Sequence, residues 1–99
     1  MKANNKDYFP EDVRLNVMRK KGGILPGSIN EEHFWLLMEI LPIHSRKVIC
    51  AMREHLVYGV SRKEVCAKYE VNNGYLNISI SKLSYAHQIV RHMMQYYKI

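Results

Sequence analysis

The sequence predicts a small all-α domain that contains a helix-turn-helix. Two observations favour this class: apolar residues recur at spacings of three and four, and residues that commonly cap or end helices flank those runs. The length of 99 residues suits one domain with a modest core. We expect a flexible basic N-terminal arm over residues 1–23 and a helical helix-turn-helix domain over residues 24–99.

The first well-marked helix is expected between Asn30 and Pro42. Asn30 suits the N-cap, and the two glutamates that follow it lie where the helix dipole favours negative charge. Pro42 cannot continue the hydrogen-bond ladder, so we expect the helix to end there. A weaker pattern in the arm allows a short helix over residues 11–19.

Three further helices are expected. The second runs from about Ser45 to Tyr58, with Gly59 just past its end in a left-handed conformation. The third starts at the capping box formed by Ser61 and Glu64 and ends near residue 69 or 70. The fourth opens around residues 72–74 and passes Leu83, after which the pattern allows one long helix or two with a bend near residue 84.

Residues 61–83 have the pattern of a helix-turn-helix, which needs a short helix, a tight turn and a second helix packed across the first. Glu70 occupies the turn position where glycine is favoured because the backbone there is commonly left-handed. Four residues are expected to support the motif by packing: Cys66, Val71, Leu76 and Ile80.

The charge distribution favours a polyanionic partner. The formal net charge is +6, and every acidic residue lies at or before Glu70. Beyond Val71 the charged side chains are Lys82, Arg91 and Lys98, all positive. The last third of the chain therefore presents no side-chain carboxylate that would repel an anion.

Double-stranded DNA is the partner that this combination predicts. Asn73 and Asn77 would face base edges, since asparagine commonly pairs with adenine in the major groove. Arg62 lies at the start of the first motif helix, a usual place for a backbone contact. The predicted DNA-binding residues are Arg62, Lys63, Asn72, Asn73, Tyr75, Asn77, Ser81 and Lys82. The alternative is that residues 61–83 are two packed helices without a DNA role.

Other classes of function have less support. The sequence has no catalytic motif, and its five histidines do not have the spacing of a known metal site, so we expect no enzyme activity, metal, cofactor or small-molecule ligand. Cys50 and Cys66 are expected to be buried free thiols. The polar start is unlike a secretory signal and no apolar run spans a bilayer, so we expect a cytoplasmic protein.

The stripe that contains Phe34, Trp35 and Met38 is either core or an oligomer interface. Adjacent phenylalanine and tryptophan side chains exceed one narrow helix face, and aromatic residues and methionine are enriched at interfaces. The Met- and Tyr-rich segment over residues 93–97 favours an oligomer for the same reason.

Several short stretches together resemble the PapB family of fimbrial and adhesin operon regulators of enteric bacteria. They are Leu25-Pro26-Gly27-Ser28, Glu32-His33-Phe34, Ile43-His44-Ser45, residues 61–66 and Asn72-Asn73-Gly74-Tyr75, while the family's Gly-Arg-Leu reads Ser81-Lys82-Leu83 here. The resemblance implies an all-helical regulator that binds AT-rich repeated sites cooperatively as an oligomer, often at its own promoter. It also implies minor-groove contact, and places Arg62 and Cys66 in the family's helix-turn-helix.

Two other functions stay open at this point. The chain could be a protein-interaction adaptor that uses the motif as a scaffold and binds through the surface around Trp35. It could also be a nucleoid-type DNA binder with little sequence preference. The choice between major-groove and minor-groove contact is open as well.

Overall fold

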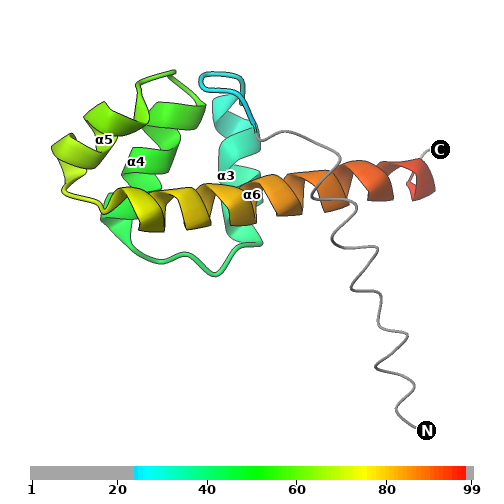
Figure 1. Ribbon diagram of the computed structural model, residues 1–99. Coiled ribbons are helices and arrows are strands. Elements are labelled where there is room, and N and C mark those ends of the chain that lie inside the picture. The colour runs from blue at the N-terminus through cyan, green and yellow to red at the C-terminus, as the bar shows by residue number, and fades with distance from the viewer. Residues whose placement is uncertain (1–23, 98–99) are drawn as a thin grey trace, which may run out of the picture.

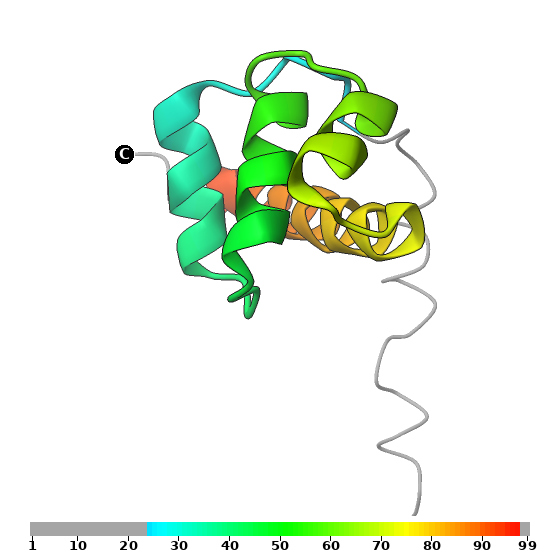
Figure 2. The same ribbon diagram turned by 90° about the vertical axis from the view of Figure 1, so that its left-hand side faces the viewer.

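A computed structural model describes residues 24–97, and within them every regular element is helical. Helices α3 (Glu31–Glu39), α4 (Arg46–Leu56) and α5 (Arg62–Tyr69) stand side by side, and α6 (Asn73–Met93) crosses them (Figures 1 and 2). A single 3-10 turn, η1 (Met94–Tyr96), follows α6. The all-α prediction is confirmed, whereas the arm and its short helix lie outside the described residues.

The four expected helix starts are confirmed by their caps. The Asn30 carboxamide accepts from the Glu32 amide at 2.8 Å, and the Ser61 hydroxyl accepts from the Glu64 amide at 3.1 Å. Ser45 caps α4 and Asn72 caps α6 in the same way. Because each cap satisfies an amide that has no partner inside its helix, each contributes about 1 kcal/mol to stability.

Helix α3 ends at Glu39, three residues before Pro42, so the expected end at the proline is wrong. The amides of Ile40 and Leu41 bond to carbonyls three residues back, at 3.1 and 3.2 Å, which tightens and closes the last turn. The residue that precedes a proline is sterically disfavoured in the α conformation, so the helix stops before it reaches Leu41.

A close approach of two glycines joins the segment before α3 to the end of α4. Gly27 has φ +70° and Gly59 has φ +79°, and a Cβ atom on Gly27 would lie 3.2 Å from the Gly59 Cα. Both amides donate to the His55 carbonyl, at 3.0 and 3.2 Å. Gly27 therefore has a structural reason to be glycine, and the left-handed Gly59 is as expected.

The core lies where α6 crosses the other three helices. Its fully buried side chains come from all four helices and include Phe34, Met52, Leu56, Val65, Leu76 and Leu83. Helix α6 runs for 21 residues without interruption, so the alternative of two helices with a bend near residue 84 is wrong. Among residues 24–97, no helix has both the length and the apolar character needed to cross a membrane.

Candidate nucleic-acid interface

Helices α5 and α6 and the turn between them have the geometry of a helix-turn-helix. Glu70 ends α5 with φ 55° and ψ 51°, and it is the only non-glycine residue with positive φ among those described. The Val71 amide then bonds to the Cys66 carbonyl at 3.0 Å, and Asn72 caps α6. The left-handed turn that the sequence predicts at Glu70 is confirmed.

The four predicted support residues lie inside this motif. Val71, Leu76 and Ile80 are buried, and Cys66 is half-buried against the core. Cys50, in contrast, is exposed on α4, so the expectation that both thiols are buried is wrong. The face of α4 that carries Cys50 turns away from the neighbouring helices, and periodicity alone cannot reveal which edge of an apolar face is covered.

Arg62 and Cys66 of α5 lie beside Asn77 and Asn73 of α6, and we call these four residues the α5–α6 seam. The Arg62 Nη1 atom donates to the Asn77 Oδ1 atom at 2.8 Å, and the Cys66 Sγ atom lies 3.9 Å from the Asn73 Oδ1 atom. Residues four apart on each helix therefore pair across the crossing. Ser81 continues the row that Asn73 and Asn77 begin.

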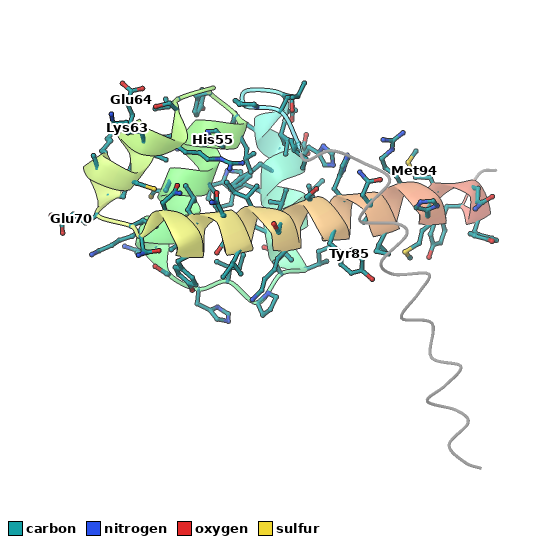
Figure 3. The ribbon with its side chains drawn as sticks, viewed as in Figure 1. His55, Lys63, Glu64, Glu70, Tyr85 and Met94 are labelled. Carbon is teal, nitrogen blue, oxygen red and sulfur yellow. The ribbon has the colours of Figure 1, made fainter. Side chains whose placement is uncertain are left out.

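The other predicted DNA-binding residues lie outside the seam. Tyr75 and Lys82 are exposed on a part of α6 well removed from the Asn73 row, since successive residues rotate by about 100° around a helix. Lys63 points outward from α5, away from α6 (Figure 3). Asn72 is exposed at the turn, where its side chain caps α6. Seven of the eight predicted residues are exposed and Asn77 is half-buried.

His55 is a member of this site that the sequence did not indicate. It ends α4, is only 3% exposed, and its Nε2 atom lies 3.3 Å from the Arg62 Nε atom. The periodicity places His55 on the apolar face of α4. It cannot show that this face meets the first residue of α5.

One carboxylate of the neighbouring helix α4, that of Glu54, is paired with side chains of α5. Glu54 of α4 accepts hydrogen bonds from Tyr69 and Lys68 of α5, and these bonds lower the pKa of its carboxyl. The charge of Lys68 is thus paired within the protein. The guanidinium of Arg62 bonds instead to His55 and Asn77, and it is in no ion pair among the described residues.

The three residues predicted for an oligomer interface are placed differently from one another. Phe34 and Met38 are buried in the core of this chain, so they have no surface to offer a second subunit. Trp35 is 43% exposed, and its indole N–H donates to Glu31 at 2.9 Å. Of the three, Trp35 alone keeps the interface prediction open. No group of three potential metal ligands occurs among residues 24–97.

A short helix, a left-handed turn and a second helix packed across it define a helix-turn-helix protein. A family model for the adhesin biosynthesis transcription regulatory proteins, the PapB family, matches residues 2–97. The chain belongs to this family. The match extends well beyond the short stretches that carry the resemblance.

Individual relatives agree with this assignment. The chain is 47% identical to the major pilus subunit operon regulatory protein PapB of Escherichia coli over 83 residues, which cover 84% of this chain and 78% of PapB. It is 38% identical over 77 residues to the AFA-III adhesin operon regulatory protein of E. coli, covering 78% and 76% of the two chains. The crystal structure of E. coli FocB superposes with a TM-score of 0.77 at 41% identity, covering 88% of this chain and 98% of FocB.

The family assignment settles the class of function. The protein is a transcription regulator of adhesin operons, and transcription regulation is not an enzymatic role.

Proposed function

We propose that the protein regulates its fimbrial or adhesin operon by binding AT-rich repeated sites in double-stranded DNA through the α5–α6 seam and the exposed residues beside it. The observation that carries this proposal is the position of Arg62. Arg62 is exposed at the start of α5, and within the described structure its guanidinium bonds to His55 and Asn77 and to no carboxylate. An arginine placed in this way keeps its full charge for a phosphate or a base edge.

The surroundings of Arg62 support the same role. Asn73 and Ser81 are exposed on the adjacent row of α6, and Lys63 and Lys82 add positive charge on other exposed parts of the two helices. No side-chain carboxylate follows Glu70 in the chain. The surface along α6 therefore offers hydrogen-bond donors to an anion without charge repulsion.

We propose further that the protein binds cooperatively as a homo-oligomer and acts at its own promoter among others, in the cytoplasm and at the nucleoid. Support for oligomers comes from exposed apolar side chains at the end of α6 and in η1. Met94 is 60% exposed and Tyr96 is 78% exposed. Exposed aromatic and methionine side chains that are grouped in this way are typical of subunit contacts.

Titration of duplex DNA tests the proposal. One duplex carries an AT-rich repeated motif, a second is scrambled at equal composition, and each is measured at about 50 and 200 mM salt because phosphate contacts release counterions. We expect tight, cooperative and salt-dependent binding to the first duplex. Equal weak binding to both would favour an adaptor, and equal tight binding would favour a nucleoid-type protein.

Two variants locate the interface. Arg62→Ala should lower affinity for the repeated duplex by roughly 5- to 100-fold and reduce the salt dependence by about one phosphate contact. Lys68→Ala is the matched control, since it removes one positive charge from the same helix at a site already paired with Glu54. Equal losses for both variants would mean that net charge, and not the seam, determines binding.

A further inference from the structure

Hydrogen bonds fix both the position of His55 and the tautomer of its imidazole ring. Its backbone carbonyl accepts from the amides of Gly27 and Gly59, which fixes the end of α4. Its Nδ1 atom lies 2.7 Å from the Val60 carbonyl oxygen. Because a carbonyl oxygen only accepts hydrogen bonds, Nδ1 carries a proton.

The second ring nitrogen of His55 then faces an obligatory donor. Its Nε2 atom lies 3.3 Å from the Arg62 Nε atom, and a guanidinium donates at every position. Nε2 must therefore present its lone pair. The two contacts together specify the neutral imidazole with its proton on Nδ1.

Arg62 is held at a second point by Asn77. The Arg62 Nη1 atom donates to the Asn77 Oδ1 atom at 2.8 Å, so the amide oxygen of Asn77 faces Arg62 and its NH2 group points elsewhere. Two of the five guanidinium N–H groups are used in these contacts and three remain.

We infer that His55 is a positioning residue for Arg62, and that His55, Arg62 and Asn77 form one preorganised unit that presents N–H donors to DNA. The inference rests on the proposed function, since it assigns an orienting role behind the Arg62 contact. An arginine side chain has many rotamers, and holding it before DNA arrives reduces the entropy lost on binding.

The unit also changes the role expected of Asn77. Bidentate pairing with adenine uses the amide oxygen as acceptor and the NH2 group as donor. In this protein the oxygen is engaged by Arg62. We therefore expect Asn77 to hold Arg62 and to contribute N–H donors, in place of the bidentate adenine contact predicted from the sequence.

The first test needs no DNA. Nitrogen NMR of the imidazole rings at neutral pH should show His55 with the proton on Nδ1 and a lone pair on Nε2. Arg62→Ala should shift the Nε2 resonance and leave Nδ1 protonated, while Lys68→Ala should change neither. A proton on Nε2 in the unsubstituted protein would overturn the inference whatever the protein does with DNA.

The second test is a double-mutant cycle on DNA affinity. His55→Leu removes both ring hydrogen bonds, and we expect about a tenfold loss of affinity for the AT-rich duplex. His55→Gln keeps one donor and one acceptor and should recover most of that loss. In an Arg62→Ala background neither change should alter affinity further, because His55 acts through Arg62.

The outcomes of these experiments distinguish a failure of the positioning role of His55 from a failure of the proposed DNA interface. An equal loss on His55→Leu with and without Arg62 would overturn the positioning role. Thermal unfolding of each variant shows whether the fold survives, and the Gln variant keeps the cycle decisive if the Leu variant does not fold. If Arg62→Ala itself leaves affinity unchanged, the proposed interface is wrong, and the NMR test still decides the unit in the free protein.

Discussion

The two halves of α6 differ in what covers them. In residues 73–83, Leu76, Ile80 and Leu83 are buried where the helix crosses α3, α4 and α5. Beyond Leu83 only Gln88 is buried among the described residues. The second half projects past the other helices and continues into η1, with Met94 near its end (Figures 1 and 3).

The apolar pattern is nevertheless continuous along both halves. An apolar groove of about 510 Å³ lies between the second half and the segment that joins α3 to α4. Its lining side chains are Ile40, Leu41, Pro42, Lys82, Tyr85, Ala86, Ile89, Val90 and Met93. Periodicity thus identifies the apolar face of a helix, while the length of the neighbouring helices decides how much of that face is buried.

The largest expected difference between the halves is in their contribution to stability. Leu83→Ala should lower the free energy of unfolding by about 2–5 kcal/mol, because it leaves a cavity in a fully buried site. Val90→Ala should lower it by less than about 1 kcal/mol, since Val90 is 37% exposed. Urea unfolding of both variants at low protein concentration measures the contrast. Similar losses would show that a second copy covers the outer half in solution.

A substitution at Glu70, in the turn before α6, should make the protein more stable. Glu70→Gly should raise the free energy of unfolding by about 1 kcal/mol, because it removes the steric cost of a side chain at φ 55°. Ala67→Gly, at an exposed position inside α5, should lower it by about 1 kcal/mol. Urea unfolding should therefore show changes of opposite sign in the free energy of unfolding of the two variants. A loss of stability in both would contradict the left-handed turn at Glu70.

The helices that cover the first half should loosen at low pH. Hydrogen bonds from Arg53, Tyr58 and Trp35 lower the pKa of Glu31 from 4.5 to about 2. The folded state therefore favours the ionised carboxylate, and this stabilisation is complete above pH 4.5 and is lost as the pH falls toward 2.

Melting temperatures between pH 2 and 6 measure this effect. Between about pH 4.5 and 2, the melting temperature of Glu31→Gln should change less with pH than that of the unsubstituted protein. Glu39→Gln, at the exposed end of α3, is the control. The effect should be modest because the ion pair is partly exposed to solvent. An unchanged profile would mean that the α3–α4 ion pair does not form in solution.

The smallest expected effect is at the end of the second half. Tyr96→Ser should change the free energy of unfolding by no more than about 0.5 kcal/mol, because Tyr96 is 78% exposed. The same variant should weaken cooperative DNA binding if η1 contributes to subunit contacts. A large loss of stability that depends on protein concentration would show that folding and association are coupled.

Much of the fold follows from local rules in the sequence. Asn30, Ser45 and Ser61 mark the helix starts, and Glu70 and Gly59 take the left-handed conformations expected of them. These features depend on hydrogen bonds and backbone sterics within about four residues, so a single sequence can reveal them.

Other features require the packed chain. Phe34 is buried and Trp35 is exposed because of where α4 and α6 lie against α3. Cys50 is exposed because the helices packed against α4 do not cover its side of that helix. The apolar residues of a helix show which side of it is buried, but they do not show how much of that side the neighbouring helices cover.

The family and the candidate interface at residues 61–83 were therefore evident in the sequence by itself, because motif spacing, caps and charge are local properties. The tertiary structure alone decided that His55, Arg62 and Asn77 meet. These residues belong to three different helices and are separated by 7 and 15 positions. Only burial of the shared core brings those helices close enough for their polar groups to bond.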